Sequence, residues 1–243
     1  MPPVPDVLSG GCHHHFTGKV HPGCGFVGVD MKAYLRSNFF IQSVMFFIGL
    51  PMLIWAMSGL PTRSFLKESL SIVTILAFCQ MVGQFYWART NRGAVKSLRM
   101  SKLLKYHKII GYIFVPILLF HPLFLVVPRF FESGITPYEA LITLLTTFNQ
   151  GVVLGIMAWG LMLILGITAL FRNKLPMKYT TWRVFHGILA MLFVFVAAWH
   201  AMDLGRHVNL AMSILISMLA AGGFLLLLRT YTLNSQRKSA RVK

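Results

Sequence analysis

Four histidines stand in two pairs of equal spacing, inside segments that are otherwise almost wholly apolar. His107 and His121 lie in KYHKIIGYIFVPILLFHP, and His186 and His200 lie in WRVFHGILAMLFVFVAAWHAM. Fourteen residues separate the members of each pair. A lone membrane histidine is more often a buried polar group satisfied by a neighbour. Imidazole is also a common metal ligand, so two matched intervals in apolar surroundings favour a binding function.

Helical geometry places the two members of each pair on one side of a helix. Fourteen residues turn an α-helix through about 1400°, roughly 40° short of four full turns. Fourteen is also two heptads, the interval that keeps a seam facing its neighbour in a bundle. The two rings are then about 21 Å apart along the helix axis. One histidine of each pair is therefore expected in each half of a hydrocarbon core of about 30 Å.

The helices that carry these histidines are expected to span a membrane. The chain has 243 residues, of which 56% are hydrophobic and only 12% charged, and its mean hydropathy is +0.67. A soluble fold could not cover this much apolar surface with so few charges. Six charge-free runs are each long enough to cross the bilayer as a helix. They are residues 37–62, 69–88, 109–128, 140–171, 184–202 and 207–228.

The sequence therefore predicts an all-α integral membrane protein, a bundle of six transmembrane helices over residues 37–228. Residues 1–36 are expected to form an N-terminal extension, and residues 229–243 a basic tail. Nineteen of the 23 Lys and Arg residues fall in 1–36, 89–108, 172–183 and 229–243. Short basic loops stay cytoplasmic, which predicts both termini inside a plasma or inner membrane. The net charge of +17 then indicates contact with anionic lipid or an acidic partner, not with nucleic acid.

Topology determines which histidines can meet. The third and fifth spans run in the same direction, so His107 and His186 share the cytoplasmic level, and His121 and His200 share the outer level. Zinc would normally require four ligands at one point, which neither level supplies. Neutral imidazole is a common axial ligand of haem iron. The histidines therefore predict two b-type haems between the third and fifth helices, one at each level.

Cations near the histidines are candidate partners for the anionic haem propionates. Arg183 lies one turn from His186, and Arg206 follows His200 at the outer end. Both could equally be ordinary interfacial anchors.

A second metal-binding pattern lies in the N-terminal segment CHHHFTGKVHPGC. Its candidate ligands are Cys12, His13, His15, Cys24 and a histidine assigned to position 22. Position 22 is in fact Pro22, and the histidine of this part of the segment is His21. Such a set could hold zinc or iron, although its spacing matches no known zinc finger. Docking of a redox partner and an inert N-terminal cap are the alternatives.

The residues carry a family resemblance over about residues 40–230. The pattern His107-x3-Gly111-Tyr112, then His121-Pro122, then Trp182-Arg183-x2-His186 and His200 resembles the ferric reductase-like transmembrane domain. That superfamily includes NADPH oxidases, ferric-chelate reductases and the membrane cytochrome of bacterial methionine sulfoxide repair. The resemblance implies a six-helix bundle that binds two haems and passes electrons across the membrane.

The chain departs from the oxidases and ferric reductases of that superfamily after the sixth span. Those relatives continue into flavin- and nicotinamide-binding domains, whereas no GxGxxG motif follows the sixth span here. We therefore expect a separate electron donor: an FAD-containing flavoprotein, an iron–sulfur protein or membrane quinol. The acceptor is expected on the outer face.

Three functions follow from these observations. The favoured one is a dihaem cytochrome b, an electron-transfer subunit of an oxidoreductase. The second is a haem-containing anchor subunit of a larger redox complex. The third is a proton or ion transporter with a histidine relay. It is the weakest, because such relays usually include intramembrane carboxylates and all six Asp and Glu lie outside the helix centres.

Overall fold

Six helices long and apolar enough to cross a membrane make up most of the computed structural model, which describes residues 38–61 and 63–239. Their spans are Phe39–Ala56, Phe65–Gly83, Met100–Leu125, Gln150–Leu170, Tyr179–Leu204 and Leu210–Thr232. No strand occurs in this part of the chain. The predicted all-α architecture with six spans is confirmed.

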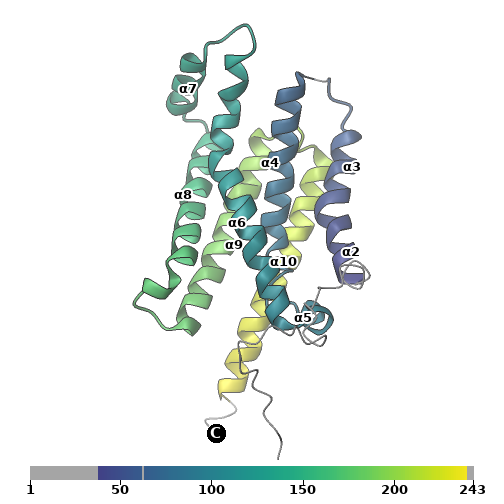
Figure 1. Cartoon of the computed structure of the whole chain (residues 1–243), viewed down its shortest axis with the longest axis vertical. Coiled ribbons are helices and arrows are strands. Elements are labelled where there is room, and N and C mark those ends of the chain that lie inside the picture. Colours follow the sequence, from purple (N-terminus) through teal and green to yellow (C-terminus); the bar gives the residue numbers. More distant parts are fainter. Residues whose placement is uncertain (1–37, 62, 240–243) are drawn as a thin grey trace, which may run out of the picture.

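The long helices lie side by side, and two short helices, α5 (Arg92–Leu98) and α7 (Pro137–Thr146), mark the two ends of the bundle (Figure 1). The long helices are α4 (Phe65–Gly83), α6 (Met100–Phe120), α8 (Gln150–Leu170), α9 (Tyr179–Leu204) and α10 (Leu210–Ser239). The short helix α5 and the C-terminal part of α10 lie at one end, here called the basic end. The other end, here called the far end, holds α7.

The first span combines three helical segments because Pro51 lies within it. α2 (Asn38–Val44) passes into a π-helical turn, η1 (Met45–Gly49), and then into α3 (Leu50–Ala56). Proline has no N–H, so the carbonyl of Phe47 lacks its usual donor four residues later. Gln80 of α4 donates its side-chain Nε2–H to that carbonyl at 3.5 Å. The effect of Pro51 is therefore a local π-helical turn within a continuous span.

Several helix boundaries differ from the expected ones, and three differences matter most here. The fourth run does not start at residue 140, because α7 ends at Thr146 and α8 begins at Gln150. Asn149 caps α8 by accepting a hydrogen bond from the N–H of Val152. α6 begins earlier than expected, so its first two turns include basic residues. α10 continues to Ser239, well past the apolar run.

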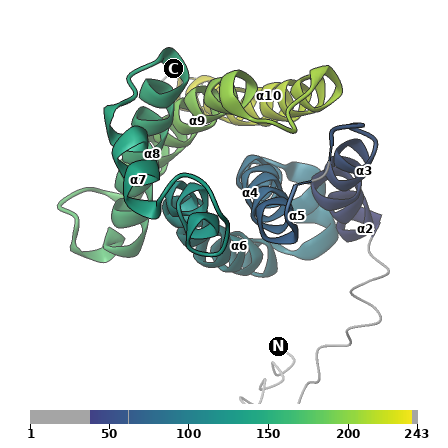
Figure 2. The ribbon, with the colours of Figure 1, turned by 90° about the horizontal axis from the view of Figure 1, so that it is seen from above.

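The helices pack in the order α3, α4, α6, α8, α9 and α10, and α10 closes the arrangement against α3 and α4 (Figure 2). The closest packing joins α8 to α9. Buried residues of α8 and α9 belong to one apolar core, which also includes Phe78 and Val82 of α4 and Ile216 of α10. α6 and α9 are not among the helix pairs that pack closely, although α9 and α6, with His121 directly after it, carry the four histidines. They are instead bridged by α8, which packs on both.

Many large apolar side chains point outward from these helices. Met218 and Leu225 of α10 are 69% and 66% exposed, and Ile156 of α8 is 55% exposed. In water such a surface would be unfavourable, whereas lipid tails solvate it. This outward-facing apolar surface supports the membrane assignment beyond the hydropathy of the sequence.

Candidate functional site

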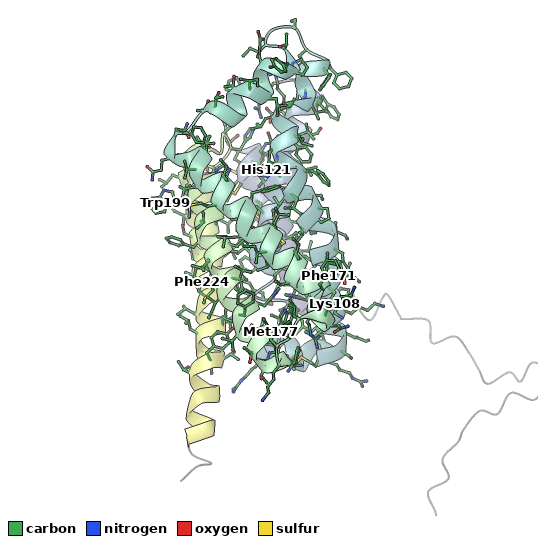
Figure 3. The ribbon with its side chains drawn as sticks, turned by 90° about the vertical axis from the view of Figure 1, so that its left-hand side faces the viewer. Lys108, His121, Phe171, Met177, Trp199 and Phe224 are labelled. Atoms are coloured by element: carbon green, nitrogen blue, oxygen red, sulfur yellow. The ribbon has the colours of Figure 1, made fainter. Side chains whose placement is uncertain are left out.

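The four histidines form two pairs between α6 and α9, one toward each end of the bundle. The ring centroids of His107 and His186 are 6.4 Å apart, and those of His121 and His200 are 6.3 Å apart. Figure 3 labels Lys108 and His121 near opposite ends of the bundle. We call His107 and His186 the basic-end pair, and His121 and His200 the far-end pair. The structure thus brings together the residues that the sequence predicted would meet.

Both rings of the far-end pair are held through Nδ1 by a main-chain carbonyl. Nδ1 of His200 is 2.7 Å from the carbonyl oxygen of Gly151, and Nδ1 of His121 is 2.6 Å from that of Leu118. A carbonyl only accepts, so each Nδ1 carries the hydrogen when the imidazole is neutral. Each Nε2 then keeps its lone pair, which is the form of histidine that binds a metal through Nε2.

The sequence His121-Pro122 explains why the Leu118 carbonyl is open to His121. In an α-helix that carbonyl would accept from the N–H of residue 122, and Pro122 has none. The chain changes there from α6 to a 3₁₀ segment, η2 (His121–Leu125). Proline therefore ends the α-helical ladder at the ligand candidate and makes an acceptor available to its ring.

The basic-end pair has a different environment. Nδ1 of His186 is buried without a hydrogen-bond partner in the described part of the chain, and the His107 ring lies beside the main chain of Gln84 and Trp87. The His186 ring stacks on Trp182, with centroids 4.9 Å apart and planes at 29°. Trp182 stacks in turn on Tyr179 at 6.0 Å. An aromatic column therefore runs from the partly exposed Tyr179 to the half-buried His186.

The spacing of each pair fits one metal ion between two imidazoles. A metal–nitrogen bond of roughly 2 Å on each side, with about 1 Å from each nitrogen to its ring centre, gives centroids about 6 Å apart. No group of three or more His, Cys, Asp or Glu that could hold a metal occurs in the described residues. Two ligands per site suit a planar haem, whose macrocycle supplies the other four, better than zinc.

The cations predicted near the histidines have identifiable partners. The guanidinium of Arg183 lies 5.8 Å from the ring centre of Tyr179. Arg172, closer to the same ring at 4.3 Å, also faces Trp182. Arg206 donates from Nη2 to the carbonyl of Pro61 at 2.7 Å, so it joins two far-end loops. A role for Arg183 and Arg206 at haem propionates stays a prediction.

Two glycines near the histidines differ in their surroundings. A Cβ on Gly187 would overlap the hydroxyl of Tyr231, so Gly187 admits a side chain of α10. A Cβ on Gly111 would meet only Nε2 of Gln84, at 3.9 Å. That amide donates to the main-chain carbonyl of His107 at 3.2 Å and links α4 to the basic-end pair.

A charged cluster at the far end was not foreseen from the sequence. His207 is 5% exposed, and its Nε2 lies 2.9 Å from Oε2 of Glu68. Arg63 binds the other oxygen of Glu68 at 2.9 Å and also donates to Ser71. Burial lowers the pKa of His207 although the carboxylate of Glu68 opposes this shift. The cluster joins α4 to the loop between α9 and α10.

An apolar groove of about 660 Å³ lies between α9 and α10. Its lining includes Phe195, Trp199 and Phe224, with Asp203 as its charged member. Trp199 and Phe224 mark this side of the bundle in Figure 3. None of the four histidines lines the groove, so it is separate from the space between α6 and α9.

The predicted N-terminal metal ligands lie outside the described residues. One member of that set is corrected by the sequence itself: a histidine at position 22 is wrong, because the residue there is Pro22. The proline side chain has no atom that can bind a metal, so the ligand role passes to the preceding residue, His21. The set is then Cys12, His13, His15, His21 and Cys24, all within residues 1–37, and the site stays a prediction.

Comparison with known proteins identifies the family of this chain. The family model described as "Ferric reductase like transmembrane component" matches residues 73–197, which include His107, His121 and His186, and His200 follows three residues later. An uncharacterized protein of Archaeoglobus fulgidus is 43% identical over 166 residues, which cover 68% of this chain and 91% of the relative. No solved structure matches the chain. The family model covers just over half of the sequence, and the chain belongs to the family of ferric reductase-like transmembrane components.

Proposed function

We propose that the protein is a dihaem b-type membrane cytochrome that transfers electrons across the bilayer. Membership of the ferric reductase-like family indicates a membrane redox role. The observation that carries the finer proposal is the presence of two histidine pairs with ring centroids 6.4 and 6.3 Å apart. Each pair offers two imidazole nitrogens, which would hold one haem iron.

The histidines would hold the two haems at different depths in the membrane. His107 and His186 would bind one haem, and His121 and His200 the other. Haem iron, when bound, supplies one-electron redox chemistry. The helices supply position: α6 and α9 present the imidazoles, and the surrounding apolar side chains keep water away from them. Arg183 and Arg206 are the proposed partners of the propionates.

The donor is proposed to act at the basic end. The first turns of α6 and the segment before α9 concentrate Lys and Arg there, including Lys102, Lys105, Arg172 and Lys174. This end is proposed to face the cytoplasm, with both termini inside. A flavoprotein, an iron–sulfur protein or membrane quinol would supply the electrons. The acceptor would lie beyond the far end, on the outer side of the plasma or inner membrane.

The six-helix domain is proposed to extend over residues 37–228, with 1–36 and 229–243 as cytoplasmic extensions. A role as a haem-containing anchor of a larger complex would use the same histidines. An assay of electron transfer through the protein separates the two, because an anchor needs haem for folding but passes no electrons.

The first test is the haem content of the purified protein. Expression in haem-replete cells should give two haems b per chain by pyridine haemochrome analysis. The reduced protein should show the spectrum of bis-imidazole haem. A protein that folds without haem under these conditions would contradict the proposal. It would indicate that the histidines have structural or transport roles.

A further inference from the structure

We propose that α8, which carries none of the four histidines, positions the far-end pair. This inference rests on the proposed function for its redox consequence. The positioning residues are Gly151, Gly155 and Trp159. They are four residues apart, so they share one face of α8. α8 packs most closely on α9 and also packs on α6, which lets one face reach both ligand-bearing helices.

Gly151 fixes which nitrogen of His200 carries the hydrogen. Its carbonyl oxygen lies 2.7 Å from Nδ1 of His200 and can only accept. The neutral ring is therefore held as the Nδ1–H tautomer, and Nε2 is left free to ligate. A hydrogen bond of this kind also fixes ring orientation and raises the basicity of a ligating imidazole.

Gly155 holds the same ring by close approach. A Cβ at position 155 would lie 2.7 Å from Cε1 of His200 and 2.9 Å from Nδ1. Contacts this short are not tolerated, so any side chain would force the ring to move. That movement would displace Nδ1 of His200, the atom that is hydrogen-bonded to the carbonyl oxygen of Gly151. Glycine is thus required at position 155 by the ring of His200.

Trp159 acts on the other ligand-bearing helix. Its indole Nε1–H donates to the carbonyl of Leu119 at 2.9 Å. The preceding carbonyl, that of Leu118, is the one that accepts from His121. Trp159 therefore anchors the last turn of α6 at the point where His121 is oriented. α8 acts on His200 directly and on His121 through the α6 main chain.

The decisive pair of variants is Gly155→Ala and Gly160→Ala. Both add one methyl group to α8, but a Cβ at Gly160 would meet nothing within 4 Å. Gly155→Ala should shift the midpoint potential of one haem to a more positive value, because the weakened Nδ1 bond makes the ligand less basic. The other haem should keep its potential, and Gly160→Ala should match the natural protein.

The redox titration has clear contrary outcomes. Equal potentials in the two variants would overturn the proposal. Loss of both haems in Gly155→Ala alone would also overturn it, because that result indicates a general packing role. Loss of one haem, with the basic-end haem retained, supports it, since the retained haem reports a folded bundle.

A second measurement does not depend on haem. Protein expressed without haem and labelled with ¹⁵N-histidine reports the tautomer of each ring by NMR. His200, assigned with His200→Gln, should be in the Nδ1–H form in the natural protein and in Gly160→Ala, and should lose this preference in Gly155→Ala. An unchanged tautomer would contradict the inference. A natural protein that binds no haem would instead contradict the proposed function, so the two failures are distinguishable.

Trp159→Phe tests whether Trp159 positions His121 through the main chain of α6. It removes the indole N–H and keeps an aromatic ring. Trp182→Phe is the matched control, because Trp182 donates its indole N–H to the Thr168 carbonyl at 3.2 Å near the basic end. Trp159→Phe should shift the far-end haem alone, and Trp182→Phe should leave that haem unchanged. A shift of the far-end haem in both variants would overturn a specific role for Trp159.

Discussion

The basic-end and far-end histidine pairs have almost the same spacing but different surroundings. At the far end, both Nδ1 atoms face main-chain carbonyls, those of Leu118 and Gly151. At the basic end, Nδ1 of His186 lacks a partner among the described residues and Trp182 stacks on that ring instead, while the His107 ring lies beside the main chain of Gln84 and Trp87. The far-end rings are therefore held by directional hydrogen bonds, and His186 by the flat face of an indole.

This contrast has a functional consequence under the proposed mechanism. An imidazole whose Nδ1–H is hydrogen-bonded to a carbonyl is a more basic ligand than one without this bond. A more basic ligand stabilises oxidised iron. Two sites with the same ligand type can therefore have different potentials without any change of ligand. Under the proposed mechanism, the hydrogen-bond partners of the ligands therefore contribute to the direction of electron flow.

The largest expected effect is loss of one haem by removal of a ligand. His121→Ala or His200→Ala should lower the haem content from two to one per chain, and each should remove the same haem. His107→Ala or His186→Ala should remove the other. Haem quantification gives the number of haems that remain, and redox titration identifies which of the two haems is lost.

His207→Ala is the matched control for those four variants. His207 is buried but belongs to the cluster with Glu68, so two haems should remain. If His107→Ala and His186→Ala removed different haems, the pairing across α6 and α9 would be wrong.

The next effect concerns the aromatic column at the basic end. Trp182→Leu removes the ring stacked on His186, and an aromatic pair contributes about 0.5–1.5 kcal/mol beyond its buried area. Retention of the basic-end haem should fall by roughly 2- to 10-fold, as measured by haem transfer to apomyoglobin. Far-end haem should be retained as before.

Tyr179→Leu provides the control for this experiment. Tyr179 contacts Trp182 and not His186, so its replacement should have a smaller effect. A larger loss from Tyr179→Leu than from Trp182→Leu would show that stacking on the histidine is not the cause.

A smaller effect is expected in the reduction rate by a soluble donor. An acidic flavoprotein should be steered to the basic end, so stopped-flow haem reduction should slow as salt screens the attraction. Arg172→Gln should slow it a few-fold at low salt, whereas Arg129→Gln at the far end should not. A rate independent of salt would favour quinol as the donor.

The smallest expected difference between the ends is a pH effect. Burial lowers the pKa of His207, opposed by Glu68 and aided by Arg63 and Arg206, while the Trp55 ring packs 6.0 Å away. The unfolded state, with a histidine pKa of about 6.5, then binds a proton more readily than the fold. Stability should therefore fall as pH drops below about 6.5.

Thermal unfolding in detergent from pH 7.5 to 5 measures this effect. His207→Gln should reduce the loss on acidification, and the basic-end haem spectrum should not change with pH over this range. A gain of stability on acidification would show that the pairing with Glu68 outweighs burial.

Much of this protein could be predicted from local patterns. Charge-free runs long enough to cross the bilayer predict spans because lipid cannot satisfy an open backbone. The 14-residue intervals predict one histidine of each pair toward each end, and the structure has them there. Boundaries were less predictable: the run from residue 140 hides a helix start at Gln150, because an uncharged cap such as Asn149 does not interrupt a charge-free run.

Other features required tertiary structure. Gly151, Gly155 and Trp159 read as ordinary small or aromatic residues of a membrane helix, and no local pattern links them to His200 or to α6. His207 likewise looks like a loop histidine until Glu68 of α4 is placed beside it. Composition and helical periodicity act within one segment, so the sequence by itself determined the spans and the ligand candidates. Hydrogen bonds and close approaches between helices depend on how the helices pack, so only the fold decided what surrounds each histidine.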